Sequence, residues 1–158
     1  MEHRKVVIIG AGHVGSHCAY ALAAAGDCEE IVLVDLLPEK AAAQALDVAD
    51  SVSFMDYAVT VRSGGYAECG SAALVVVAVG EPRLPGQTRL DLLGRSVELL
   101  KALAQELKPL GLTCPVVTIT NPADIVADWL RKALELERWQ CFGTGTLLDT
   151  ARLVRCIS

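Results

Sequence analysis

The chain has 158 residues, which is the length of one ordinary domain. Hydrophobic residues make up 53% of it and charged residues 21%, and this composition excludes a disordered chain or a coiled coil. Fourteen Lys and Arg against 19 Asp and Glu give a formal net charge of −5, which argues against nucleic acids and anionic membranes as partners.

Short β-branched runs alternate along the chain with longer stretches rich in Ala and Leu. Uninterrupted apolar runs such as Val75-Val76-Val77 are typical of strands that are covered on both faces in a parallel sheet. In chain order the pattern predicts strand Lys5–Gly10, helix Val14–Ala25, strand Glu30–Asp35, helix Pro38–Asp50, strand Ala58–Arg62, strand Leu74–Gly80, helix Leu90–Lys108, strand Pro115–Thr120, helix Ala123–Leu134 and strand Trp139–Phe142. This alternation predicts the α/β class, with a doubly wound parallel six-stranded sheet and right-handed crossovers.

A glycine-rich loop follows the first predicted strand. Gly10, Gly12 and Gly15 form the pattern G-x-G-x-x-G between that strand and a helix. Glycines at such a turn let the backbone approach a pyrophosphate, and the N–H groups at the helix N-terminus face its charge. Asp35 ends the second strand 20 residues after Gly15, where a carboxylate can accept hydrogen bonds from a ribose diol.

The acidic residue also bears on which dinucleotide is bound. A carboxylate at Asp35 repels a 2′-phosphate, and Leu36 and Leu37 provide no cation to receive one. The sequence therefore predicts NAD rather than NADP. Lys40, on the first turn of the next helix, either reaches the ribose region or lies in solvent.

The remaining chemistry-bearing residues are few. The three histidines are His3, His13 and His17, and the last two belong near a pyrophosphate, so none is a candidate general acid or base for hydride chemistry. The six cysteines form no C-x-x-C pair, which predicts small buried thiols in a reducing compartment and no metal site. The longest apolar run, Ala72–Val79, is too short to span a membrane, so a cytoplasmic protein without a membrane partner is predicted.

Three further segments carry polar groups that suit a ligand or a surface equally well. Arg83 and Arg89 lie in a loop rich in Gly and Pro before the long helix, and their guanidinium groups can pair with carboxylates or remain solvated. Asn121 follows the fifth strand, where it can bond a carboxamide or a substrate oxygen, or simply begin a helix. Asp149 and Arg152 are spaced for an exposed ion pair on one helix face.

In these segments taken together, the chain resembles the lactate/malate dehydrogenase family. The matching pieces occur in family order and at family spacing across nearly the whole chain: Gly10–Gly15, Asp35, Pro85–Leu93, Thr120–Asp124 and Gly145–Arg152. The resemblance implies a single NAD-binding Rossmann domain over residues 1–158, with NAD as the cofactor. For the intact enzyme it implies hydride transfer between NADH and a 2-oxo acid, and assembly into a homo-oligomer, either a dimer or a tetramer.

The resemblance also implies roles for individual residues. Arg89 is similar to the arginine that polarises the substrate carbonyl, and Arg152 to the one that holds the substrate carboxylate. Asp149 resembles the carboxylate that orients the catalytic histidine, and Asn121 the asparagine that contacts substrate and nicotinamide. Further matches to cofactor-contacting positions are Val14, Lys40, Tyr66, Gly80 and Ile119.

Three departures from the family pattern matter for function. The chain stops at Ser158, whereas the family's catalytic His and the rest of its substrate pocket lie further along, in a second domain. Ser96 stands where the family's long helix usually carries Asn. Arg83 occupies the substrate-reading position, where malate dehydrogenases usually show Arg and lactate dehydrogenases Gln, although the residues around Asp149 and Asn121 look more lactate-like.

Two hypotheses follow from the sequence. The first is the NAD-binding domain of an L-2-hydroxyacid dehydrogenase, specific for malate or lactate, whose small-molecule substrate is a 2-hydroxy or 2-oxo acid. The second is a dinucleotide-binding module without catalysis of its own, acting as a sensor or partner domain. The residues that follow position 158 in the encoded protein discriminate between them, because the first requires a catalytic His there.

Overall fold

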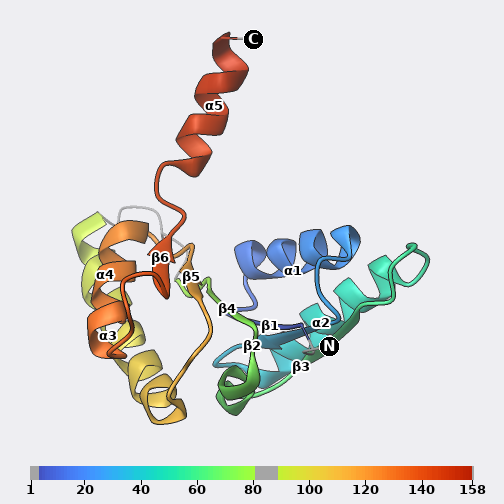
Figure 1. Cartoon of the computed structure of the whole chain (residues 1–158), viewed down its shortest axis with the longest axis horizontal. Coiled ribbons are helices and arrows are strands. Elements are labelled where there is room, and N and C mark those ends of the chain that lie inside the picture. The colour runs from blue at the N-terminus through green and yellow to red at the C-terminus, as the bar shows by residue number, and fades with distance from the viewer. Residues whose placement is uncertain (1–3, 81–88, 158) are drawn as a thin grey trace.

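In the described part of the chain, six parallel strands form a sheet with helices on both faces (Figure 1). The computed structural model describes the backbone of residues 4–80 and 89–157, and the side chains of residues 4–80 and 97–157. The elements in chain order are β1 (Lys5–Ile9), α1 (His13–Ala25), β2 (Glu30–Val34), α2 (Pro38–Val52), β3 (Thr60–Ser63), the 3-10 helix η1 (Tyr66–Ser71), β4 (Leu74–Val77), α3 (Arg89–Leu107), the 3-10 helix η2 (Lys108–Leu110), β5 (Val116–Thr118), α4 (Ala123–Ala133), β6 (Cys141–Gly143) and α5 (Leu147–Ile157).

The strand order is β3-β2-β1-β4-β5-β6, and every neighbouring pair is parallel. The predicted doubly wound fold is therefore confirmed. The order reverses between β1 and β4, and ligands of open α/β sheets bind outside the carboxyl ends of the strands at such a point. Ile9 is in register with Val34 on one side and Val77 on the other, so β1, β2 and β4 end together at this edge.

Two apolar cores, one on each face of the sheet, explain why the strands are continuously hydrophobic. Val7 and Ile9 point into the core that contains α3 and α4, whereas Val6 and Ile8 point into the core that contains α1 and α2. Because successive side chains of a strand face opposite sides, a strand covered twice must be apolar at every position.

The predicted element boundaries needed correction at several ends. β4 stops at Val77 instead of Gly80, because its neighbour β1 ends: the N–H of Ala78 makes the last hydrogen bond, to the Ile9 carbonyl at 2.8 Å. β5 is likewise shorter than predicted. α2 runs past the predicted end at Asp50, because Val52 is buried in the core of that face.

α5 differs from the other α-helices of the described ranges in having no buried residue. It extends away from the sheet, with the C-terminus at its far end (Figure 1). Four cysteines are buried as predicted, and burial raises the pKa of Cys69 to about 12. Cys156 is exposed because it lies on α5, so the prediction was wrong there. None of the helices in the described ranges combines the length and apolar character that crossing a bilayer requires.

Candidate functional site

The glycine loop adopts a turn that only glycine fits at two of the three glycine positions of the G-x-G-x-x-G pattern. Gly10 has a φ of +105°, and a Cβ there would lie 2.5 Å from the Ala78 carbonyl oxygen. A Cβ at Gly15 would overlap the Gly10 carbonyl oxygen. These two glycines are therefore needed by the fold itself, because they bring β1, the turn and α1 into close contact.

Gly12 has a different role from its two neighbours. It is the N-cap of α1 in an extended conformation with φ −83°, and no atom lies within 4 Å of the position where its Cβ would be. The space is open, and it adjoins the unpaired N–H groups of the first turn of α1. A glycine here leaves room for an anion to approach the backbone and the positive end of the helix.

Asp35, just after β2, is held by the glycine loop. One carboxylate oxygen, Oδ2, accepts the Ala11 N–H at 2.8 Å and the Lys40 ammonium at 3.2 Å, while Oδ1 accepts the Leu37 N–H at 3.1 Å. Burial alone would raise the pKa of Asp35, but these hydrogen bonds and the charge of Lys40 lower it below the usual carboxyl range. Asp35 is therefore a fixed carboxylate with lone pairs still available to a ligand.

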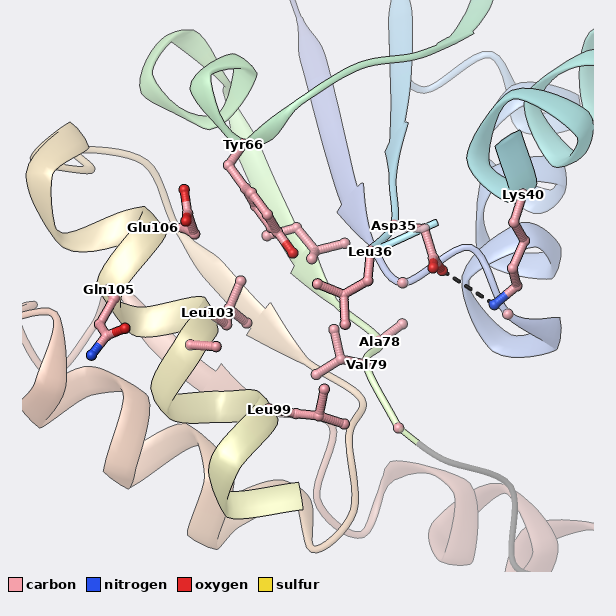
Figure 2. Close-up of a pocket in the computed structure, with 15 residues that line it drawn as sticks. Asp35, Leu36, Lys40, Tyr66, Ala78, Val79, Leu99, Leu103, Gln105 and Glu106 are labelled. Atoms are coloured by element: carbon pink, nitrogen blue, oxygen red, sulfur yellow. Dashed lines mark hydrogen bonds and ion pairs between the residues drawn. The ribbon is translucent and has the colours of Figure 1, made fainter. Parts of the chain in front are cut away.

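A cavity of ≈ 290 Å³ opens at the carboxyl edge of β1, β2 and β4 (Figure 2). It brings together six of the residues predicted to bind a cofactor: Gly10, Gly12, Asp35, Lys40, Tyr66 and Gly80. Its other walls are largely apolar and come from the strand ends and from α3: Ile9, Leu36, Ala78, Val79, Leu99, Ala102, Leu103, Gln105 and Glu106. An apolar cavity with a few fixed polar groups is the usual form of a small-molecule site.

Tyr66 lines this cavity from η1. An ion-pair network joins η1 to β1 and β3. The buried Lys5 ammonium donates to Glu68 at 2.8 Å, and Arg62 donates to Glu68 at 2.7 Å. These partners lower the pKa of Glu68 to about 2, the hydrogen bond from Arg62 being the larger cause. The network therefore anchors η1, the element that carries both Glu68 and Tyr66.

Four of the predicted cofactor residues do not line the cavity. Gly15 is buried in α1 and Val14 is exposed on the same helix, whereas Asn121 is exposed before α4 and Ile119 packs against the core that contains α1 and α2. Ile119 and the residue before Asn121 nevertheless adjoin the end of β4: the Ile119 N–H donates to the Val77 carbonyl at 2.9 Å, and the Thr120 hydroxyl donates to the Val79 carbonyl at 2.7 Å. These contacts tie the end of β5 to the end of β4.

Of the residues predicted to act on the substrate, Asn121, Asp149 and Arg152 are described, and none of these three lines the cavity. Arg152 donates to Asp149 at 3.4 Å, and both side chains are exposed on α5, as expected for an ion pair on one helix face. Arg89 is the first residue of α3, and its side chain lies outside the described residues, as does that of Ser96. Arg83 also lies outside the described residues.

The wall contributed by α3 was missed by the sequence analysis. Leu99, Leu103 and Glu106 line the cavity at spacings of four and three, which place them on one side of the helix. Leu103 is also buried. No local signal in the sequence shows that this side of the helix meets the segment around Asp35, about seventy residues earlier in the chain.

The chemistry of these groups fits a dinucleotide. Gly12 and the N-terminus of α1 suit a pyrophosphate, Asp35 suits a ribose diol, and the apolar cavity beside Asp35 suits the flat base attached to that ribose. The three subsites follow the order in which a nucleotide's parts are bonded.

Residues 4–143 match the family model described as lactate/malate dehydrogenase, NAD binding domain. Among curated proteins, the L-lactate dehydrogenase of Fusobacterium nucleatum is 40% identical over the full chain, which covers 49% of that protein. The L-lactate dehydrogenase of Macrococcus caseolyticus is 36% identical over 98% of the chain and 49% of that protein. The chain thus spans about half the length of these relatives.

Solved structures of a lactate and a malate dehydrogenase also match this chain over about half of their own length. The ligand-bound minor L-lactate dehydrogenase from Enterococcus mundtii superposes with a TM-score of 0.89 at 38% identity, over 94% of this chain and 48% of that one. The malate dehydrogenase from Archaeoglobus fulgidus, solved in complex with NADH, superposes with a TM-score of 0.90 at 30% identity, over 97% of this chain and 52% of that one.

Proposed function

The chain belongs to the lactate/malate dehydrogenase family, and we propose that it is the NAD-binding half of an L-2-hydroxyacid dehydrogenase. In the complete enzyme a hydride passes between NADH and a 2-oxo acid. The observation that carries the proposal is the placement of the glycine loop, the fixed Asp35 carboxylate and the apolar cavity at one sheet edge.

Each part of the site has a separate task in holding the cofactor. The N–H groups of the first turn of α1 face the pyrophosphate across the open space at Gly12. Asp35 accepts the hydroxyls of the adenosine ribose and disfavours a 2′-phosphate by charge. Bound NAD supplies the hydride chemistry, and the protein fixes where its reactive ring lies relative to the substrate.

The roles on the substrate side of the reaction are proposals that rest on the resemblance to the family. We propose that Arg89 polarises the substrate carbonyl, that Arg152 holds its carboxylate and that Asn121 contacts substrate and nicotinamide. Asp149 then orients a catalytic histidine supplied by a further part of the protein, and α5 carries Asp149 and Arg152 towards that part. We further propose that the complete enzyme is a homo-oligomer.

We expect the purified 158-residue chain to bind NAD but to show negligible oxidation of NADH with pyruvate or oxaloacetate. General acid–base catalysis contributes about 10²–10⁴-fold, and both described histidines lie on α1 at the pyrophosphate end of the site. The Fusobacterium enzyme is a suitable positive control in a spectrophotometric assay. Steady turnover by the chain alone would contradict the proposal that the catalytic histidine comes from a further part of the protein. A gene whose continuation encodes no histidine-bearing domain would instead favour a non-catalytic binding module.

Substrate choice gives a separate prediction for a longer protein that carries the second domain. We propose that Arg83 reads the second carboxylate of oxaloacetate, because pyruvate would leave its guanidinium unpaired in a closed site. Arg83→Gln is then expected to shift the ratio of kcat/KM for oxaloacetate over pyruvate towards pyruvate, by about tenfold or more. The measurement is kcat/KM for oxaloacetate and for pyruvate, in the unmodified protein and in Arg83→Gln. An unchanged ratio would show that Arg83 does not select the substrate.

A further inference from the structure

The cavity contains a second carboxylate, Glu106, for which the proposed function has no task. Glu106 lies on α3, on the same side as Leu99 and Leu103, and with them it lines the cavity. Among the described residues none forms an ion pair or hydrogen bond with it, whereas the nearby acids of α3 and η1, Glu98 and Glu68, each pair with a cation. An acid without a partner beside a ligand cavity is available to the ligand.

The two acids of the cavity stand at different places around Tyr66. In Figure 2, Asp35 and Glu106 lie to opposite sides of the tyrosine ring, and the neighbouring Gln105 side chain points away from the cavity. Burial and then the charges of Glu106 and Asp35 raise the pKa of Tyr66, so its hydroxyl remains protonated. Between the two acids the walls are apolar and suit the faces of a flat ring.

The position of the ribose determines what reaches Glu106. With the pyrophosphate at Gly12 and the ribose diol at Asp35, the base extends from the ribose into the apolar part of the cavity, where α3 forms the wall. A carboxylate accepts hydrogen bonds and donates none. The exocyclic amino group of adenine is a donor, whereas the oxo group at the same position of hypoxanthine is an acceptor.

Resting on the proposed function, we propose that Glu106 accepts a hydrogen bond from the exocyclic amino group of the bound adenine and makes the site select an aminopurine over an oxopurine. The net charge of the chain is −5, and a carboxylate in the cavity repels the dinucleotide's own pyrophosphate. That repulsion acts on every dinucleotide alike, so only a hydrogen bond to the base can make Glu106 discriminate between two dinucleotides.

The test compares NAD with nicotinamide hypoxanthine dinucleotide, whose base carries an oxo group and an adjacent N1–H where adenine carries an amino group and an unprotonated N1. Calorimetric titration of the chain is expected to show about tenfold tighter binding of NAD, equivalent to about 1.4 kcal/mol. In Glu106→Gln the ratio of the two dissociation constants is expected to fall to about twofold, because the amide can accept a hydrogen bond from the amino group and donate one to the oxo group. In Glu106→Ala, whose side chain neither accepts nor donates a hydrogen bond, the preference for NAD is also expected to disappear.

Because the removal of a negative charge strengthens the binding of both anionic dinucleotides alike, the ratio of their dissociation constants isolates the contact to the base. Glu98→Gln is the matched control, because it makes the same change at another exposed acid of α3 that does not line the cavity. Glu98 pairs with Lys101 at 2.9 Å, and its substitution is expected to leave the tenfold preference for NAD intact. Circular dichroism melting curves check that all variants fold.

The outcomes separate this inference from the proposed function. If the wild-type chain binds both dinucleotides equally, or if Glu106→Gln and Glu106→Ala both retain the gap, Glu106 is a solvated surface acid and the inference is overturned while the dinucleotide site stands. If neither dinucleotide binds, the proposed function fails and the inference fails with it. A gap that closes in Glu98→Gln as well would show that charge on α3, and not a contact at Glu106, discriminates between the bases.

Discussion

Gly12→Ala is expected to weaken NAD binding by about 10- to 100-fold and to change the free energy of unfolding by less than about 1 kcal/mol. Alanine adopts the extended backbone of Gly12 without strain, and no atom lies within 4 Å of the new Cβ. The methyl group therefore meets no part of the protein. It occupies the space through which the pyrophosphate approaches the N-terminus of α1, and a hydrogen bond lost to a charged group costs about 1.5–3 kcal/mol.

Gly15→Ala is the matched comparison, and it is expected to destabilise the fold where Gly12→Ala does not. Alanine inside a helix normally stabilises it by about 1 kcal/mol relative to glycine. Here the Cβ would overlap the Gly10 carbonyl oxygen and contact the Ile8 side chain at 3.4 Å, so a net loss of about 1–3 kcal/mol is expected. NAD binding is expected to fall as well, because α1 must move away from the loop.

Urea unfolding and calorimetric titration of the two variants distinguish the two kinds of glycine. Equal destabilisation by both substitutions would show that Gly12 is also part of the packing. A stable Gly15→Ala variant that binds NAD normally would contradict the close contact between α1 and the loop.

A second large effect is expected at Asp35. The wild-type chain should bind NAD(H) at least tenfold more tightly than NADP(H), a difference of about 1.4 kcal/mol. Asp35→Ala should weaken NAD binding, because the acceptor for the ribose diol is lost, and should narrow the gap, because the charge that repels the 2′-phosphate is lost too. Since the pKa of Asp35 lies below the usual carboxyl range, the wild-type preference should be constant above about pH 5.

Lys40 provides a control within the same site. Its ammonium lies 3.2 Å from Asp35 and its side chain is about half exposed, so in Asp35→Ala it becomes free to pair with a 2′-phosphate. The double variant Asp35→Ala with Lys40→Ala is therefore expected to bind NADP more weakly than Asp35→Ala alone. Calorimetric titration with both dinucleotides measures this, and equal or tighter binding of NADP by the wild-type chain would contradict the role of Asp35.

The strands, the helices and the glycine loop were predictable because their signals are local. An apolar run such as Val75-Val76-Val77 must be covered on both faces wherever it lies, and Gly10, Gly12 and Gly15 are close together in the chain. The place of Asp35 at the end of β2 followed in the same way. Prediction failed at element ends, where β4 stops at Val77 because the neighbouring strand stops, a condition set by another part of the chain.

The sequence by itself therefore determined the α/β class, the glycine loop between a strand and a helix, and the acidic residue that follows the second strand. Only the tertiary structure decided that Lys40 pairs with Asp35, that α3 supplies the wall on which Glu106 stands, and which predicted residues lie outside the cavity, namely Val14, Gly15, Ile119 and Asn121. The physical reason is one of range. Periodicity and turn chemistry depend on neighbours within a few residues, whereas a cavity forms where separate elements pack, and which faces meet there depends on the strand order of the whole sheet.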